Sequence, residues 1–302
     1  MLRSWTGGED RARQAARPPS RFDVRPLGRA DQAVALRALD RNPVRDVFIA
    51  SRILHDGALT SLGPSPLWGA FDHDQELQGL LHVGPNLVPA IDDEAVCEAL
   101  AAAAGGLYPT RMLVGERVMV ELLWSMVGPS YPAPREVRRR QYVYALEPDW
   151  LAHDLSVGAA GTARLAERSD EDRVLRLSAA MYTEEMGENP MARDPDGYRR
   201  RVRMLSARGW TYVYEDRGRL QFKMDVGCAS DRTAQIQGVY VPPELRGRGV
   251  GTTAMTACCA LAFARHPNLS LYVNDFNAPA VALYERIGFR RASFDFQTIM
   301  LP

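Results

Sequence analysis

Residues 239–251 carry the sequence VYVPPELRGRGVG, which predicts a β-strand, a tight turn and a glycine-rich loop that opens a helix. Pro242 and Pro243 end the strand, because proline cannot donate a ladder hydrogen bond. The start of a helix presents unpaired N–H groups and the positive end of the helix dipole. Glycines let a large anion approach those groups, because no Cβ stands in the way. We therefore expect residues 246–252 to hold a phosphate or pyrophosphate.

Two common phosphate-binding patterns fit this loop poorly. A P-loop requires a lysine inside the pattern G-x-x-x-x-G-K-[ST], and the only lysine of the chain, Lys223, lies upstream of the loop. A dinucleotide fingerprint requires G-x-G-x-x-G, but the spacing here is G-x-G-x-G and Thr252 occupies the place of the third glycine. A glycine-rich turn without a ligand stays open as an alternative at this point.

A third pattern, Q/R-x-x-G-x-G/A, is met by Arg246, Gly249 and Gly251. The sequence then predicts an alanine-rich helix over residues 251–265 and a buried strand over residues 269–273.

Residues 277–289 follow with the pattern N-x-x-A-x-x-L-Y-x-x-x-G-F, in which Asn277 can cap a helix and Gly288 can end it. The two motifs and their order resemble the GNAT superfamily of N-acetyltransferases. The whole chain resembles an actinobacterial GNAT type whose N-terminal domain has no assigned function.

The resemblance covers residues 162–302 and implies a mixed α/β fold that binds acetyl-CoA. It implies that the loop holds the pyrophosphate, that the preceding strand binds pantetheine through its backbone, and that an asparagine contacts the cofactor. The implied cofactor-binding residues are Val239, Tyr240, Val241, Arg246, Gly247, Arg248, Gly249, Val250, Gly251, Thr252, Asn274 and Asn277.

The resemblance also implies that Tyr284 is the general acid, because a phenol with a reference pKa of ~10 is protonated at neutral pH. A tyrosine packed in the core is the alternative. The expected strand before the loop offers Gln235 and Gln237 where many family members have a glutamate. We therefore consider Glu184, Glu185 and Glu188, expected in a loop between the first two helices, as candidate bases. A water molecule, or no base at all for an acceptor of low pKa, is a further alternative. A solvated acidic turn is an equal alternative.

The expected activity is acetyl transfer from acetyl-CoA to a primary amine, on a small molecule, a peptide N-terminus or a lysine, by direct transfer. The acidic pair favours a cationic acceptor. A longer acyl-CoA donor stays open. The alternatives are a non-catalytic module that binds acetyl-CoA and an enzyme similar to mycothiol synthase, which also has tandem GNAT domains.

The first half of the chain echoes the second, and we predict a tandem GNAT fold with a mixed, mostly antiparallel sheet flanked by helices in each half. The sequence around Leu77 parallels that around Leu220, and Trp124 takes the position of Tyr284. The segment that would hold the glycine loop is missing from the first copy. We expect a disordered tail (1–20), a degenerate GNAT-like domain (21–146), a linker (147–161) and a catalytic domain (162–302).

Composition narrows the function further. The formal net charge is zero, with 37 basic and 37 acidic residues, and no apolar run is long enough to cross a bilayer. We expect neither a nucleic-acid nor a membrane partner, a cytoplasmic location, no bound metal, and a possible homodimer. The four cysteines lack metal-ligand spacing and are expected to be buried. The arginine runs 138–140 and 199–201 are expected to be solvated, although an anionic acceptor or partner could use them.

Overall fold

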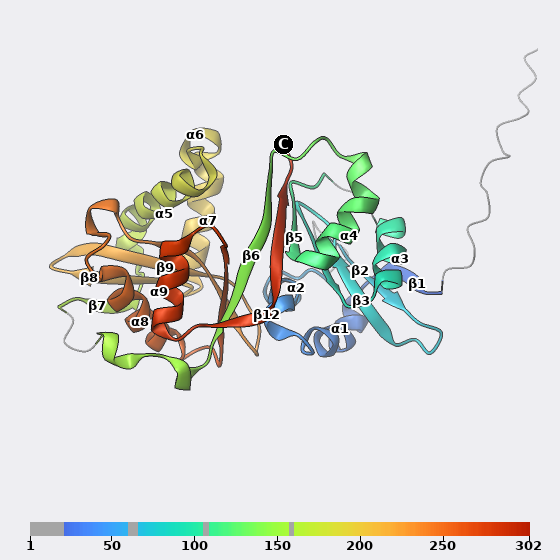
Figure 1. Cartoon of the computed structure of the whole chain (residues 1–302), viewed down its shortest axis with the longest axis horizontal. Coiled ribbons are helices and arrows are strands. Elements are labelled where there is room, and N and C mark those ends of the chain that lie inside the picture. The colour runs from blue at the N-terminus through green and yellow to red at the C-terminus, as the bar shows by residue number, and fades with distance from the viewer. Residues whose placement is uncertain (1–20, 60–65, 105–108, 157–159) are drawn as a thin grey trace, which may run out of the picture.

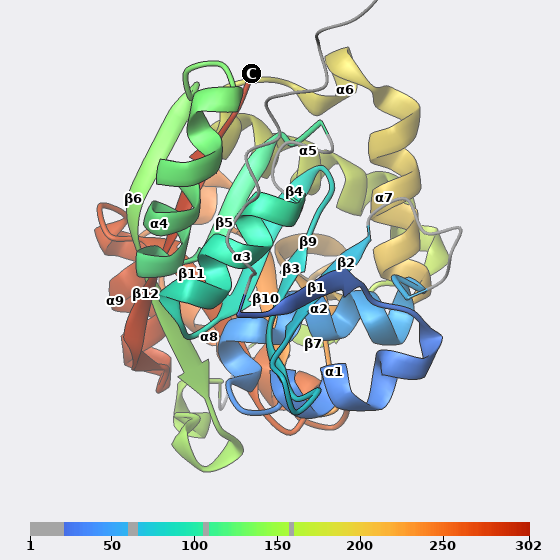
Figure 2. The same cartoon turned by 90° about the vertical axis from the view of Figure 1, so that its right-hand side faces the viewer.

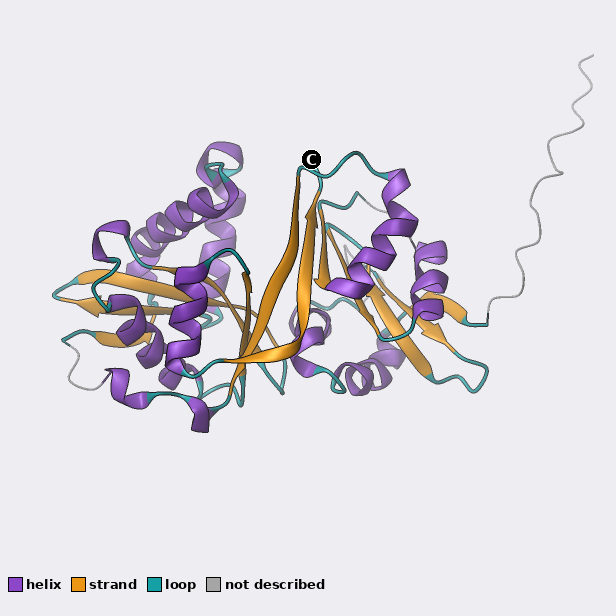
Figure 3. Cartoon of the chain, in the orientation of Figure 1, coloured by secondary structure: helices purple, strands orange, loops and turns teal. Residues whose placement is uncertain are grey.

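The computed structural model of the chain describes residues 21–59, 66–104, 109–156 and 160–302, so the tail expected over residues 1–20 lies outside the described residues. Two lobes share a single sheet (Figure 1). The twelve strands of this sheet run in the order β1-β2-β3-β4-β5-β12-β6-β11-β10-β9-β8-β7. Helices cover both faces of the sheet in each lobe (Figure 3). None of the helices in the described ranges is long and apolar enough to cross a membrane.

The two halves repeat the same order of elements. In the first half they are β1 (Asp23–Pro26), α1 (Gln32–Leu39), α2 (Pro43–His55), β2 (Leu67–Phe71), β3 (Leu77–His82), β4 (Asn86–Ile91), α3 (Glu94–Ala104), β5 (Met112–Glu116), α4 (Arg117–Val127) and β6 (Glu136–Leu146). In the second half they are β7 (Thr162–Leu165), α5 (Glu171–Met186), α6 (Pro190–Arg193), α7 (Pro195–Ala207), β8 (Thr211–Asp216), β9 (Arg219–Ala229), β10 (Ala234–Tyr240), α8 (Val250–Ala262), β11 (Leu269–Asn274), α9 (Ala278–Ile287) and β12 (Arg290–Met300). The short helix α6 is the one addition among the α-helices and strands described, so the predicted repeat is confirmed.

The last strand of each half lies in the sheet of the other half. β6 pairs antiparallel with β11, in a register that joins Leu146 to Leu269, and β12 pairs antiparallel with β5. β6 and β12 also pair with each other at the centre of the molecule, where Figure 1 shows them side by side. Each half therefore completes the sheet of its partner half. The boundaries at residues 146 and 162 stay a prediction.

Side chains of the exchanged strands enter the core of the opposite half. Tyr144 and Leu146 of β6 are buried in the cluster that α8 and α9 form with the second half of the sheet. Ile299 of β12 packs with α3 and α4, which lie next to each other in Figure 2, and Phe296 packs with α1 and α2 on the other face. Full burial of an apolar side chain contributes roughly 1.5–3 kcal/mol. The exchange thus joins the two cores through several such contributions.

The described part of the first half lacks the elements of a cofactor site. Only Asp92 and Asp93 separate β4 from α3, whereas residues 241–249 separate β10 from α8. Asp93 caps α3 by accepting a hydrogen bond from the N–H of Val96 at 3.1 Å. The guanidinium of Arg45, almost fully buried, binds the carboxylates of Asp46, Asp92 and Glu116 next to this turn. Carboxylates at the start of α3 would repel a pyrophosphate, which agrees with the predicted loss of the glycine loop.

Stability is expected to depend on pH through His82, which is 4% exposed. Its Nδ1 lies 2.7 Å from the carbonyl oxygen of Asn86, and burial lowers its pKa from 6.5 to about 4. On acidification, His82 is protonated near pH 6.5 in the unfolded chain but only near pH 4 in the folded chain. The contribution of neutral His82 to the free energy of unfolding is therefore complete above pH 6.5 and is lost as the pH falls through 4. Between pH 7.5 and 5 this residue should remove about 2 kcal/mol of the free energy of unfolding.

Urea unfolding at the two pH values, on the parent chain and on His82→Gln, tests this expectation. The variant should lose less stability on acidification than the parent chain by that amount. Equal losses in both proteins would show that His82 is not held neutral in the folded state.

Candidate active site

The loop between β10 and α8 has the geometry of an anion site. Gly247 and Gly249 adopt φ values of +70° and +79°, in the left-handed region that favours glycine, and added Cβ atoms there would meet no other atom within 4 Å. α8 begins at Val250, and its first internal hydrogen bond runs from the N–H of Thr253 to the carbonyl of Gly249 at 3.1 Å. The N–H groups that precede Thr253 in α8 are therefore available to an anion.

A gap between strands leads away from this loop. β10 pairs in parallel with β11 only at Ala234 and Gln235, and its register with β9 shifts between Gln237 and Tyr240. Gly238 lies within this bulge with a φ of +59°. The backbone from Gly238 onward has no strand partner on the β11 side, so it can pair with an extended ligand.

The gap opens into a cleft of about 860 Å³ that gathers most of the expected site residues. Its walls include Glu184, Glu185, Val239, Tyr240, Val241, Arg246, Asn274, Asn277 and Tyr284. Residues 247–252 are not part of its walls and continue from Arg246 into α8. Asn277 caps α9 as expected, because its side chain accepts a hydrogen bond from the N–H of Ala280 at 3.3 Å.

Tyr284 lies on α9 and is 7% exposed, at the wall of the cleft. Its ring stands edge-on to Phe289 at 5.7 Å between centroids and lies 6.5 Å from the ring of Tyr144. Burial raises the pKa of its hydroxyl well above the usual range, with the charge of Glu185 acting in the same direction. The phenol is therefore neutral at physiological pH and can donate a proton or a hydrogen bond into the cleft.

Glu184 acts as a structural link between the cleft wall and the glycine loop. Its carboxylate accepts a hydrogen bond from the hydroxyl of Tyr240 at 2.9 Å and from Nη2 of Arg246 at 2.7 Å. Nε of Arg246 donates in turn to the carbonyl of Val241 at 2.9 Å. Since these partners engage the carboxylate and the guanidinium, Glu184 is poorly placed to accept a substrate proton.

Glu185 is the carboxylate that stays available in the cleft. The expectation that Glu184 and Glu185 lie in a loop is wrong: α5 continues through Met186 and ends where Gly187 adopts a φ of +72°. Glu185 stays exposed to the solvent of the cleft, but the surrounding walls partly desolvate its carboxyl and raise its pKa, while the charges of Arg138 and Lys223 oppose this shift. A carboxylate with a raised pKa suits a general base.

Lys223 and Asp225 belong to the site, although the sequence motifs did not identify them. Lys223 is fully buried, and its Nζ donates to Oγ of Ser178 at 3.0 Å and to Oδ2 of Asp225 at 2.5 Å. A Cβ on Gly238 would lie 2.9 Å from Asp225 and 3.2 Å from Lys223, so this pair lies directly under the bulge of β10. The sequence signal that could have identified this pair is Lys223 itself, the only lysine of the chain, on a strand rich in apolar residues.

The first half also contributes to the cleft through β6. Nε2 of Gln141 donates to Oδ1 of Asn274 at 3.0 Å, and Nη2 of Arg138 donates to the carbonyl of Glu185 at 3.0 Å. The side chain of Arg138 is only 12% exposed, so its expected solvation is wrong. The exchange of strands explains the difference, because it places β6 beside β11 and α5.

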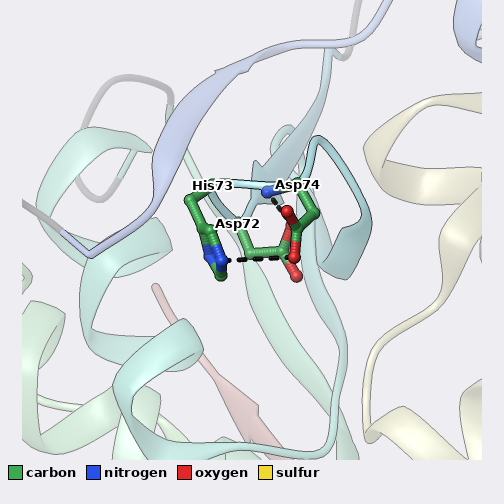
Figure 4. Close-up of side chains that lie close together, drawn as sticks. All are labelled: Asp72, His73 and Asp74. Carbon is green, nitrogen blue, oxygen red and sulfur yellow. Dashed lines mark hydrogen bonds and ion pairs between the residues drawn. The ribbon is translucent and has the colours of Figure 1, made fainter.

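One group of metal-ligand residues comes together among the residues described. Asp72, His73 and Asp74 lie close to one another in the turn between β2 and β3 (Figure 4). Oδ1 of Asp72 already accepts the backbone N–H groups of Asp74 and Glu76, both at 2.9 Å. Asp72 therefore stabilises the turn by accepting hydrogen bonds from the backbone of the turn, as aspartate commonly does, and this role explains the cluster without a metal ion. All four cysteines are free and buried, as expected.

Comparison with known proteins agrees with the geometry. Residues 179–289 match the acetyltransferase (GNAT) family, and residues 65–167 match a domain of unknown function (DUF4081). Residues 179–289 therefore form a GNAT acetyltransferase domain.

Similar curated proteins are named mycothiol acetyltransferase. The one from Actinosynnema mirum is 25% identical over 245 residues, which are 80% of each chain. The one from a Nocardioides species is 29% identical over 53% of this chain, and the match spans 58% of its own length.

Solved structures show a similar fold. A GNAT acetyltransferase from Colwellia psychrerythraea has a TM-score of 0.55 at 12% identity, over 93% of this chain and 100% of its own. A tandem GNAT protein from the clavulanic acid pathway has a TM-score of 0.51 at 12% identity, over 92% and 98% of the two chains. The tandem GNAT fold expected from the sequence is thus confirmed.

Proposed function

We propose that the protein transfers an acetyl group from acetyl-CoA directly to a primary amine, using the second half of the chain for the chemistry. The observation that carries this proposal is the continuity of the site. The unpaired edge of β10 and the buried phenol of Tyr284 line one cleft, and the anion loop at the start of α8 continues directly from Arg246 in the wall of that cleft.

Each part has a role in this reaction. The N–H groups of residues 247–252 bind the pyrophosphate, and the backbone of residues 239–241 pairs with the pantetheine arm. The amine nitrogen attacks the thioester carbon, the C–S bond breaks, and Tyr284 gives its proton to the departing thiolate. Glu185 accepts the proton that the amine loses, directly or through a water molecule.

The position of Glu185 favours an enzyme over a non-catalytic module that binds acetyl-CoA. The absence of a carboxylate from β10 had favoured a module that binds acetyl-CoA without turning it over. A carboxylate contributed by α5 to the same cleft removes that reason. An acceptor related to mycothiol is the second candidate, because the curated relatives carry that name. We also propose a cytoplasmic location, since four free, buried thiols suit a reducing compartment.

Release of coenzyme A tests the function. The purified chain should release it from acetyl-CoA in the presence of an amine from a panel of small amines, peptides and mycothiol-related amines. Mass spectrometry should find the acetylated amine. Tight binding of acetyl-CoA without product from any panel member would favour the non-catalytic alternative.

Replacement of Glu185 by glutamine should lower kcat about 100-fold, because a general base contributes roughly 10²–10⁴ to a rate. The rate of the parent chain should rise with pH as Glu185 loses its proton, at a pH above the usual carboxylate range, because its pKa is raised. The variant should lose this rise.

Glu188→Gln is the matched control, since Glu188 lies two residues beyond α5, pairs with Arg193 at 3.1 Å and is not part of the cleft wall. It should retain both the rate and the pH profile. A Glu185→Gln enzyme with an unchanged profile would exclude this residue as the base.

A further inference from the structure

Some of the cationic side chains that line the cleft have carboxylate partners, and others have none. Its walls hold six cationic side chains: Arg111, Arg138, Arg193, Arg201, Lys223 and Arg246. Four of these have carboxylate partners. Arg246 binds Glu184 at 2.7 Å, Lys223 binds Asp225 at 2.5 Å, Arg138 binds Glu136 at 2.8 Å, and Arg193 binds Glu188 at 3.1 Å.

Arg111 and Arg201 form no ion pair or side-chain hydrogen bond with any residue in the described ranges. Arg201 projects from α7 of the second half, next to the buried Val202. Arg111 precedes β5 of the first half and is fixed through its backbone, which bonds to Pro85 and Leu301 at 2.8 Å each. Both side chains are exposed to the solvent of the cleft. Two guanidinium groups from different halves thus face one space without a counter-charge.

The acidic groups of the cleft do not balance them. Glu184 and Asp225 are already paired, and Oδ1 of Asp194 accepts the N–H of Gly197 at 2.9 Å to cap α7. Glu185 is left, and we have assigned it to the acceptor amine. The expectation of a simple cationic acceptor rested on Glu184 and Glu185 acting together, and the pairing of Glu184 with Arg246 removes half of that basis.

We propose that the acceptor amine also carries an anionic group, a carboxylate or a phosphate, which Arg111 and Arg201 bind. This inference rests on the proposed acetyl transfer and specifies its substrate. The forked N–H donors of arginine match the oxygens of both anions. With the anion at the arginines, the amine is directed toward Glu185. An amine without an anion lacks this contact and meets two uncompensated positive charges.

Matched acceptors test the proposal in the full chain. One arm compares α-amino acids of varied side chain with their amides, and the other compares glucosamine 6-phosphate with glucosamine. Coenzyme A release should give at least about a tenfold higher kcat/KM for the anionic member of one arm, since the loss of one hydrogen bond between charged groups typically costs a factor of that size. The arm that shows the preference distinguishes carboxylate from phosphate.

Variants connect the preference to the two arginines. Arg201→Met and Arg111→Met should each raise KM for the anionic acceptor about tenfold or more, with kcat and the neutral acceptor little changed. Arg200→Met is the control, because Arg200 is exposed on the same helix but is not in the cleft wall. It should leave both acceptors unaffected.

Two results would overturn the proposal: neutral acceptors used as well as their anionic partners in both arms, or variants that weaken both members of a pair equally. Lack of transfer to every member would also refute it. A titration with acetyl-CoA then shows whether the proposed function fails too, because cofactor binding does not involve Arg111 or Arg201.

Discussion

Replacement of Tyr284 by phenylalanine should lower kcat by about 100-fold or more while the affinity for acetyl-CoA changes little, because a positioned general acid contributes roughly 10²–10⁴ to the rate. The side chain keeps its ring, so its packing against Phe289 should survive. The loss should concern only the proton that the buried hydroxyl provides to the thiolate. Steady-state kinetics and an acetyl-CoA titration of the same preparation separate the two quantities.

Tyr144→Phe is the control for this experiment. Tyr144 is a buried neighbour of Tyr284, but its hydroxyl donates to Glu285 at 2.7 Å and it is not part of the cleft wall. This variant should keep kcat within about twofold, since the hydroxyl of Tyr144 is engaged by Glu285 and Tyr144 does not line the cleft. Tyr284→Phe with parent-like kcat would remove Tyr284 from the mechanism.

The second large effect is expected at the glycine loop. Gly249→Asp should weaken acetyl-CoA binding by about 30-fold or more, because it adds a side chain and a negative charge where the pyrophosphate approaches the start of α8. Aspartate is among the residues that tolerate a left-handed backbone, so the fold should persist. Isothermal titration calorimetry measures the loss, and thermal unfolding reports on the fold.

Gly218→Asp is a close match for this variant. Gly218 lies in the turn between β8 and β9, has a φ of +74° against +79° at Gly249, and also has open space around an added Cβ. Both variants add one negative charge, and both place a non-glycine residue at a similar left-handed backbone conformation. Gly218→Asp should bind acetyl-CoA like the parent chain. Equal losses of affinity in both variants would show that the loop has no special relation to the cofactor.

Local signals in the sequence were sufficient for most of the second half. Asp194 and Pro195 mark the start of α7, and Asn277 and Gly288 bound α9, because caps and turns depend on residues close in sequence. In the first half, Asn42 and Pro43 form the same pattern of a cap residue followed by proline. Pro43 does begin α2, but the Asn42 side chain forms no cap hydrogen bond.

The exchange of β6 and β12 could not be predicted from the sequence. Either strand would satisfy the same alternation of buried and exposed residues in either sheet, so no local pattern distinguishes the partners. This choice decides which residues line the cleft. Arg138 and Gln141 reach the site only because β6 lies beside β11, and their chain neighbours give no indication of it.

The roles of the acidic residues depended on contacts that are equally remote. Glu184 and Glu185 are adjacent and look equivalent in the sequence. Tyr240 and Arg246, more than fifty residues away, engage Glu184 and leave Glu185 in the cleft. Motif spacing therefore located the cofactor loop, whereas the assignment of the base required the tertiary structure.

Calorimetric titration of the full chain with acetyl-CoA tests the central claim most directly. We predict saturable binding with one molecule per chain, because among the residues that the structure describes only the second half has an open helix start behind left-handed glycines. Absence of heat at millimolar ligand would contradict the account, and so would a stoichiometry of two, which would give the first half a site that its acidic turn should exclude.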